Sequence, residues 1–384
     1  MRPDTPEDAA ALLRSLGEEG RPVRPRGGGT KPWGPAIDGA VLETGGLDRI
    51  LEHNVGDFTA VLEAGVPLAE AQAAFAAHGQ MLAIDPALGA SADAAGGGAT
   101  LGGVMATNDS GPLRHRYGSM RDVVVGATVA LSDGTLAKSG GKVIKNVAGY
   151  DLAKLLVGSF GTLGLIVRVA VRLHPMPPRT ASAVGGSDDP ERLGAAALAL
   201  AATPLEADCL DLDWRDGAGR LLVRYGSAAA PDQAAATVAR MQELGLEQCG
   251  VVEDDDELWT AQRVRQRGAC VLKVSGRPTD LPAVCRAGGA VVGRPALGLS
   301  WLSLPLPRPA ASSPQPASPA LGAAVAAARD ALSPRACTLL DAPRELRAGA
   351  WAAPDPGALA LMARVKERFD PARIFRPGTF VGGI

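Results

Sequence analysis

The sequence predicts an α+β protein with two domains, the second smaller than the first. Short strand-like runs alternate with turns and helical patterns from residue 40 onwards. Residues 122–131 read as a strand, and a Ser-Asp-Gly turn leads into a second strand-like run, which indicates an antiparallel hairpin. The proline-rich segment His174–Pro178 then interrupts the pattern, and 384 residues are enough for a core on each side of it.

In the first half of the chain, the spacing of apolar residues and the residues at segment ends predict helices and strands. Residues 6–20 form a helical pattern with leucines on one side, and glycines stop it. Residues 41–43 and 59–64 read as strands. Residues 67–78 predict a helix that begins near a proline and ends at Gly79.

The next elements end the first domain. A helix carrying Leu152, Leu155 and Leu156 is expected after the hairpin. Residues 165–173 then alternate as a strand, with Arg168 and Arg172 on the face opposite to the leucines and valines.

The remaining chain predicts a smaller α+β domain with an antiparallel sheet. Helices near 190–202 and 231–244 bracket strand-like runs at 210–214 and 220–225, and the acidic run 253–257 precedes a helix with Trp259. Residues 305–319 are rich in Pro, Ser and Ala and predict an exposed, mobile loop. Asp355-Pro356 signals the start of a last helix. The expected domains are therefore 1–178, 179–350 and a terminal segment 351–384 that packs back on the first.

Composition excludes several classes of function. The apolar content of 46%, the charged content of 21% and the net charge of −2 are those of an ordinary globular protein without a basic surface for nucleic acid. The acidic start and the absence of about 18 consecutive apolar residues predict a cytoplasmic protein with no transmembrane segment. The five cysteines form no Cys-x-x-Cys pair, and the four histidines show no ligand spacing, so no metal site is expected.

Three segments rich in glycine carry the functional signal. They are Pro25–Thr30 with Lys31, the stretch from Asp85 to Asn108, and Gly158–Gly164. Glycines open positive φ and can bare backbone N–H groups toward an anion, and Arg26, Thr30 or Lys31 could donate to phosphate oxygens. In a chain with 48 glycines and 30 prolines, flexible loops are the alternative interpretation.

The spacing of the glycines excludes two common nucleotide sites. Counting from Gly96, the last glycine of a Gly-x-Gly-x-x-Gly pattern is replaced by Leu101, and counting from Gly27 it is replaced by Pro32. Lys142 follows Gly141 but precedes Val143, so the hydroxyl of a P-loop is missing. A long ligand lying across several loops fits the three segments better.

Together these motifs resemble the FAD domain of vanillyl-alcohol oxidase, or PCMH-type, flavoproteins. Residues 145–152, KNVAGYDL, with Phe369-Asp370-Pro371 and Pro377-Gly378, are similar to the FAD-binding subunit of bacterial glycolate oxidase. The resemblance covers about residues 20–178 and the last ~20 residues. It implies a two-lobed PCMH-type domain followed by a cap domain.

The resemblance also implies which residues contact FAD. The first loop would hold the pyrophosphate, the second would run beside the ribityl chain and flavin, and the third would back the adenosine half. The implied set is Pro25, Arg26, Gly27, Gly28, Gly29, Thr30, Pro86, Thr100, Gly102, Gly103, Thr107, Asn108, Gly161, Leu163, Gly164 and Ile166. No histidine stands in the first loop, so non-covalent FAD is expected.

Catalytic residues are harder to assign. Lys142, Lys145, Tyr150 and Arg376 are candidates for donors or cations near the flavin, with surface roles as the alternative. Relatives usually carry Asn where Arg376 stands, and related dehydrogenases carry a metal-binding histidine cluster in the cap. This chain has no histidine after His174, so it offers no obvious base for a hydroxyl proton there.

The leading hypothesis is therefore an FAD-binding subunit of a glycolate oxidase complex, which oxidises glycolate to glyoxylate. The resemblance implies two partners, a paralogous flavoprotein subunit and an iron–sulfur subunit that receives electrons, and peripheral contact with a membrane through them stays open. A stand-alone FAD-dependent 2-hydroxy-acid dehydrogenase and a non-catalytic assembly subunit with structural FAD are the alternatives.

Overall fold

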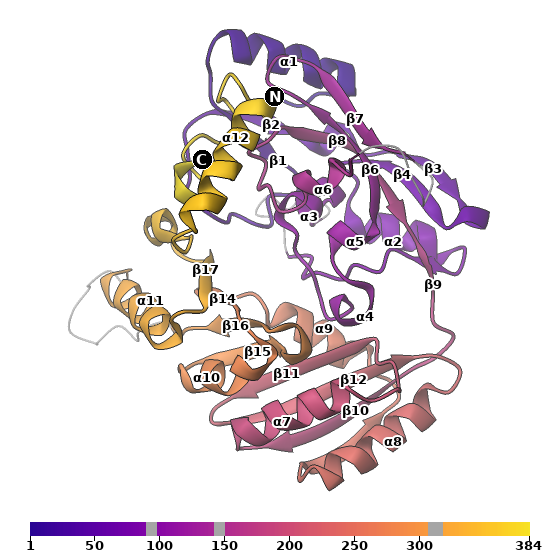
Figure 1. Cartoon of the computed structure of the whole chain (residues 1–384). Coiled ribbons are helices and arrows are strands. Elements are labelled where there is room, and N and C mark those ends of the chain that lie inside the picture. Colours follow the sequence, from indigo (N-terminus) through magenta and orange to yellow (C-terminus); the bar gives the residue numbers. More distant parts are fainter. Residues whose placement is uncertain (90–97, 142–149, 306–317) are drawn as a thin grey trace, which may run out of the picture. The chain divides into compact units, whose positions relative to one another are not determined.

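The computed structural model describes residues 1–89, 98–141, 150–305 and 318–384, which fold as two compact units (Figure 1). Unit 1 consists of Met1–Ser110, Tyr117–Met176 and Ala353–Ile384. Unit 2 consists of Gly111–Arg116 and Pro177–Ala352. Most of the loop predicted at 305–319 lies outside the described residues.

Unit 1 is built on a five-stranded antiparallel sheet with the order β3-β4-β8-β6-β7. Its strands are β3 (Ile50–Asn54), β4 (Thr59–Glu63), β6 (Val124–Ala130), β7 (Leu136–Gly140) and β8 (Leu165–Arg172). The predicted alternation in β8 is confirmed, but the strand is central, so Ile166 and Ala170 are buried on the face that also carries the half-buried arginines. Packing on both faces of a central strand produces this pattern.

Two smaller sheets complete unit 1. A parallel pair joins β1 (Val23–Arg26) to β2 (Ala40–Glu43), and an antiparallel pair joins β5 (Gln80–Met81) to β9 (His174–Pro175). The strand expected to stop at His174 therefore continues briefly in a second pairing. Short 3-10 turns lie at η1 (Thr44–Gly46), η2 (Val55–Asp57) and η6 (Val381–Gly383).

The helices of unit 1 begin and end largely where the sequence predicts. Helix α1 (Pro6–Glu18) starts after Thr5, whose hydroxyl accepts from Asp8 N–H, and α2 (Leu68–Ala76) is followed by Gly79 at φ +67°. Helix α12 (Pro356–Phe369) starts at Asp355, which accepts from Ala358 N–H. The others are α3 (Leu101–Thr107), α5 (Met120–Val123) and α6 (Ala153–Leu156), and α4 (Arg114–Tyr117) contains the change from unit 2 to unit 1.

Two of these short helices differ from the prediction. The helix expected around Leu152–Leu156 is a single turn, with Leu152 and Leu155 exposed. The strand expected from 122 begins at Val124, because Ser119 and Asp122 form a reciprocal capping box that makes Met120–Val123 helical.

Unit 2 is built on an eight-stranded antiparallel sheet with the order β13-β10-β12-β11-β15-β16-β14-β17. Its strands are β10 (Thr180–Ser187), β11 (Cys209–Arg215), β12 (Ala218–Gly226), β13 (Glu247–Val252), β14 (Val271–Ser275), β15 (Ala290–Arg294), β16 (Leu299–Ser303) and β17 (Ala336–Asp341). Its helices are α7 (Pro190–Ala201), α8 (Ala230–Glu243), α9 (Asp256–Val264), α10 (Leu281–Arg286) and α11 (Ser318–Leu332), with 3-10 turns η3 (Pro278–Asp280), η4 (Pro295–Leu297) and η5 (Arg344–Gly349). The antiparallel plan expected from four of these elements is confirmed.

One core cluster of unit 2 lies between its sheet and the helices that cover it. Alternate residues of β11, Leu210, Leu212 and Trp214, pack with apolar residues of α7, α8 and α10. Figure 1 shows these helices with the strands of the sheet. The intervening residues Cys209 and Asp211 lie on the opposite face, where α9 contributes Trp259 and Gln262. The period of two along β11 therefore separates an apolar face from a face with buried polar groups.

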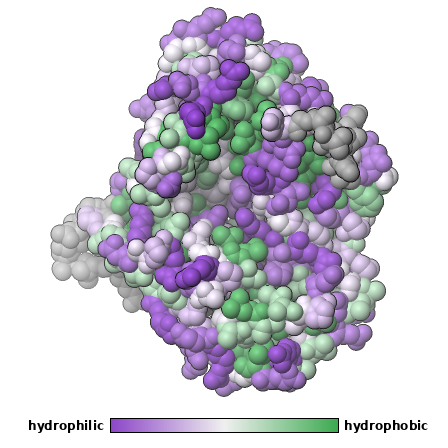
Figure 2. All heavy atoms as spheres, in the orientation of Figure 1, coloured by the Kyte–Doolittle hydropathy of each residue, from purple (hydrophilic) through white to green (hydrophobic). Residues whose placement is uncertain are grey.

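Polar and apolar side chains are mixed on the face drawn in Figure 2, where hydrophilic areas surround smaller hydrophobic ones. Such mixing is usual for exposed surfaces of folded domains. Within the described residues, no helix has the length and apolar content needed to cross a bilayer.

Candidate functional site

The first glycine segment lies directly against the second. A Cβ atom on Gly27 would overlap the Thr100 hydroxyl, and one on Gly28 would overlap the Gly98 carbonyl oxygen. Gly29 adopts φ +67°, which side-chain-bearing residues rarely do. Only glycine therefore permits the turn after β1 to pass this close to residues 98–100.

The first loop contains hydrogen-bond donors that could bind an anion. Among the backbone hydrogen bonds of the described residues, none is donated by the N–H of Gly28 or Gly29. The Arg26 guanidinium folds over the same turn, and its Nη1 lies 3.5 Å from Glu43 Oε1. Adjacent backbone donors with a cation beside them form an anion-binding concavity.

The second segment behaves differently from the expectation that its glycines bare their N–H groups. Leu101 N–H donates to Val66 O at 2.9 Å, Gly102 N–H to Ala64 O at 2.7 Å, and Gly103 N–H to its own cap, Thr100 Oγ1, at 3.3 Å. A Cβ on Gly102 would meet the Ala64 backbone. These glycines allow close packing of α3 on β4, so that part of the prediction is wrong. Gly96 and Gly97 lie outside the described residues.

The end of α3 supplies an unsatisfied polar atom. Asn108 ends the helix at φ +49°, and within the described chain its Oδ1 is buried without a hydrogen-bond partner. The preceding Thr107 hydroxyl instead donates to Gly103 O at 2.8 Å. A buried amide oxygen without a partner is unfavourable unless a ligand or water bonds to it.

The third segment touches both of the others. Gly158 N–H donates to Met105 O at 3.0 Å, and Phe160 N–H donates to Ala106 O at 2.8 Å. Gly161 has φ +71°, and a Cβ there would stand 3.4 Å from Pro25 Cγ. The structure thus brings three segments, separated by up to about 140 residues, to the N- and C-terminal ends of α3 and the end of β1.

The remaining residues of the predicted cofactor set lie in or beside these segments. Leu163 and Ile166 are buried in the unit 1 core, and a Cβ on Gly164 would press on Val129. Pro86 is buried two residues before Leu88, whose carbonyl accepts from Ala99 N–H at 3.1 Å. In the described chain these residues contact the core of unit 1 and neighbouring segments.

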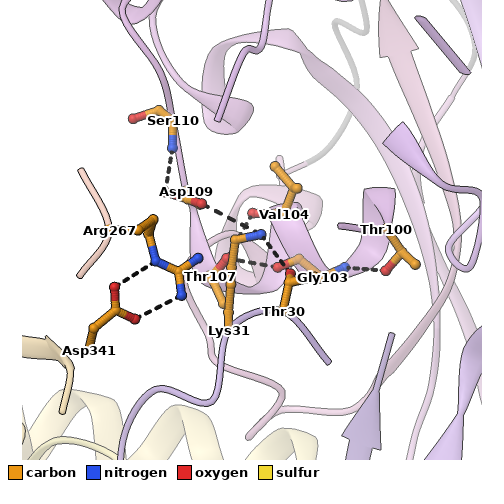
Figure 3. A network of polar contacts seen from close by, with 10 residues as sticks. All are labelled: Thr30, Lys31, Thr100, Gly103, Val104, Thr107, Asp109, Ser110, Arg267 and Asp341. Atoms are coloured by element: carbon orange, nitrogen blue, oxygen red, sulfur yellow. Dashed lines mark hydrogen bonds and ion pairs between the residues drawn. The ribbon is translucent and has the colours of Figure 1, made fainter. Parts of the chain in front are cut away.

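A buried ion pair beside the first loop, between Lys31 and Asp109, was not predicted. Lys31 Nζ lies 3.5 Å from Asp109 Oδ2 and 3.5 Å from Thr30 Oγ1, and the two charged side chains are 6% and 8% exposed (Figure 3). Asp109 Oδ1 accepts from Ser110 N–H at 3.0 Å. The sequence suggested Lys31 as a donor but did not mark Asp109, although Asn108-Asp109 after an apolar helix was an available signal.

Of the candidate catalytic residues, Tyr150 and Arg376 belong to the described part of the chain. Lys142 and Lys145 lie outside the described residues, and Tyr150 is 90% exposed. Arg376 lies beside β1, where its Nη2 donates to Trp33 O at 3.3 Å, and burial, with the nearby Arg24, lowers its pKa from the ordinary value. Its φ of +44° explains why an Asn would suit this position.

Arg376 thus has a backbone constraint and a protein partner within unit 1. In the described part of the chain, no group of three His, Cys, Asp or Glu side chains could hold a metal ion.

Comparison with known proteins identifies the domain that contains the first two glycine segments. Residues 1–140 match the family model described as FAD binding domain. This chain carries an FAD binding domain. FAD is its cofactor, and the resemblance to FAD-binding flavoproteins is confirmed. The groups at the first two loops fit such a ligand, because Gly28, Gly29 and Arg26 suit a pyrophosphate and Asn108 has a buried oxygen without a partner in the described chain.

Curated relatives agree with this domain. An FAD-linked oxidoreductase of Mycobacterium tuberculosis is 32% identical over 236 residues, which are 60% of this chain and 50% of that protein. The D-lactate dehydrogenase of Archaeoglobus fulgidus is 39% identical over 46% of this chain and 38% of its own length. Glycolate oxidase subunit GlcD of Bacillus subtilis is 34% identical over 46% of this chain and 37% of its own length. The chain spans half or less of the length of these relatives.

The fold has a counterpart among solved structures. An alkyldihydroxyacetonephosphate synthase superposes with a TM-score of 0.70 at 14% identity, covering 99% of this chain and 77% of that one. The predicted α+β class with a PCMH-type FAD-binding fold and an antiparallel second sheet is thereby confirmed.

Proposed function

We propose that this chain is the FAD-binding subunit of a complex that oxidises glycolate to glyoxylate. The observation that carries the proposal is the meeting of the three glycine segments at α3, in a chain whose relatives include a glycolate oxidase subunit and D-lactate dehydrogenases. In this proposal residues 1–178 and 351–384 hold FAD, and residues 179–350 form the cap on the substrate side.

Each loop has a distinct role in the proposal. The N–H groups of Gly28 and Gly29 with Arg26 bind the pyrophosphate, and Asn108 Oδ1 accepts a hydrogen bond from the cofactor. Thr100, Gly102, Gly103 and Thr107 shape the wall beside it, while Gly161, Leu163, Gly164 and Ile166 support the adenosine half. FAD supplies a two-electron acceptor when bound. The first loop has no histidine, so we propose non-covalent binding.

Electrons then need a route out of the flavin. The five cysteines are far apart in the sequence and form no Cys-x-x-Cys pair, so an iron–sulfur cluster would reside on another chain. A partner iron–sulfur subunit and a paralogous flavoprotein subunit therefore belong to the proposal. The cytoplasmic location stays a prediction.

The D-lactate dehydrogenase relatives favour a second candidate function. In that case the chain alone would oxidise D-lactate or another small 2-hydroxy acid. No histidine follows His174, so any base for the hydroxyl proton in residues 179–350 would have to be a different residue type.

Anaerobic mixing separates the candidates. The purified, FAD-loaded chain is mixed with glycolate or D-lactate, alone and with its candidate partner subunits, while the visible flavin absorbance is followed. Bleaching by glycolate only in the presence of partners supports the complex, and bleaching of the isolated chain supports the stand-alone dehydrogenase. FAD binding without bleaching in any mixture supports an assembly subunit, and failure to bind FAD overturns all three.

A further inference from the structure

Lys366 of α12 lies at the centre of a buried polar cluster in unit 1. Its Nζ donates to Thr162 O at 2.7 Å, to Asp370 Oδ2 at 2.6 Å and to Phe375 O at 2.7 Å. A lysine ammonium has three donors, so each one is used. The side chain is 9% exposed and that of Asp370 is fully buried.

Asp370 closes the other half of the cluster. Its Oδ1 accepts from Ile374 N–H at 3.2 Å, and its Oδ2 accepts from Phe375 N–H at 2.9 Å. The carboxylate therefore orders the turn after α12 while it neutralises the lysine. Burial lowers the pKa of Lys366, and the bond to Asp370 opposes that change.

Stability alone is a weak reason for such a pair. Removing two charges from water is expensive, and well-packed apolar residues often stabilise a fold as well as a buried ion pair does. A lysine that donates to two backbone carbonyls fixes two chain segments relative to each other, which apolar packing does less specifically.

The two segments are those that lead to the glycine loops. Thr162 is part of the third loop, between Gly161 and Leu163. The strand-like residues around Phe375 pair with the start of β1: Val23 N–H donates to Ile374 O at 2.7 Å, and Arg376 N–H donates to Val23 O at 3.0 Å. From Val23, β1 runs directly into the first loop. The segment that follows α12 therefore lies against β1.

We propose that Lys366 is a positioning residue for FAD, which holds the first and third glycine loops at the spacing that the cofactor needs. The inference rests on the proposal that these loops bind FAD. Loops held in the bound arrangement before the ligand arrives lose less conformational freedom on binding. Loss of the lysine contacts should therefore weaken FAD binding more than it alters the fold.

The test uses the full chain and three variants at this cluster. Lys366→Met removes the cation, K366M/D370N also removes the carboxylate that would be left buried and unpaired, and Lys366→Gln is a milder change that keeps an amide donor. The FAD dissociation constant is measured by quenching of flavin fluorescence, and hydrogen exchange of residues 159–164 and 374–376 is measured in the apoprotein. We expect the dissociation constant to rise about tenfold or more in each variant, with faster exchange in both segments.

Two controls separate positioning from general destabilisation. Phe75→Leu removes volume from a buried side chain of α2, and Lys138→Met removes an exposed lysine of β7. Both should leave FAD affinity within about twofold of wild type. If K366M/D370N folds with a normal melting temperature and binds FAD as tightly as wild type, or if K366Q behaves like wild type in both measurements, the inference is wrong. Wild-type protein that binds no FAD would instead overturn the assignment of the loops.

Discussion

At the scale of single residues, some glycines of this chain leave an N–H available to a ligand and others allow close packing, and the sequence does not distinguish the two roles. Gly28 has to be glycine because of a neighbouring carbonyl and also has an N–H without a backbone acceptor in the described chain. Gly102 has to be glycine for packing on Ala64, and its N–H is already bonded. Only the first kind can act on a ligand directly.

Substituting Gly28 by Ala should therefore impair FAD binding. The new methyl would overlap Gly98 O, so the two loops must separate, and the FAD dissociation constant should rise about tenfold or more in a fluorescence titration. Gly56→Ala is the matched control, because a Cβ at Gly56 has open space around it. Equal affinity of the two variants would contradict the assigned role of the first loop.

A buried acid in unit 2 makes a prediction about pH. Burial raises the pKa of Asp211 from 3.8 to about 6, although Arg294 and a bond from Gln262 oppose the change. Arg294 Nε lies 3.6 Å from Asp211 Oδ1, both side chains are fully buried, and the guanidinium lies 4.3 Å from the Trp301 ring centre. The folded protein thus binds this proton more tightly than the unfolded chain does.

Because the folded-state pKa is raised, ionising Asp211 destabilises the fold. Ionisation of Asp211 should lower the free energy of unfolding by on the order of 3 kcal/mol as pH rises from about 4 to above 6. Asp211→Asn should flatten that part of the profile, which urea unfolding at a series of pH values would measure. Parallel profiles for wild type and D211N would show that Asp211 ionises normally.

At the scale of elements, helix ends follow local chemistry. Asp355 accepts from Ala358 N–H at 2.9 Å and Pro356 occupies the first turn of α12, as the sequence predicts. The length of a helix is less local, since α6 is one turn although its leucines suggested more. Leu152 and Leu155 are 44% and 40% exposed. Because helices in proteins are stabilised mainly by packing of their apolar face, these leucines do little to lengthen α6.

Asp355→Ala should lower the free energy of unfolding of unit 1 by about 1 kcal/mol, because one N–H at the start of α12 loses its partner. Glu367→Ala, an exposed change in the same helix, should be close to neutral in the same denaturant titration. A neutral D355A would mean that water replaces the cap completely.

At the scale of the whole molecule, the two units have separate hydrophobic cores, and the loops that we propose bind FAD belong to unit 1. A ligand that binds only one folded unit stabilises that unit by mass action. FAD at about 100 times its dissociation constant should increase the free energy of unfolding of unit 1 by about 2.7 kcal/mol, and calorimetry would detect this as a higher melting temperature of the unit 1 transition. The melting temperature of the unit 2 transition should not change. An equal rise in the melting temperatures of both transitions would indicate that the two units unfold together.

Much of the fold could be predicted from sequence, because caps, turns and strand alternation depend on neighbouring residues. The number of glycine segments suggested one long ligand lying across several loops, but their arrangement was expected through resemblance, since no local signal says how distant loops meet. Asp109 and Lys366 were missed for the same reason. Their roles depend on Lys31 and Thr162, which lie 78 and 204 residues away.

The sequence by itself determined where α1 and α12 begin, that Gly79 can end α2, and that the cysteines form no Cys-x-x-Cys pair, because these features depend on residue type and short spacing. Only the tertiary structure decided that Leu101–Gly103 have no free N–H groups, that Tyr150 is exposed, and that Lys366 joins two loops. Hydrogen-bond partners and burial are set by segments far apart in the chain, so they exist only once the chain has folded.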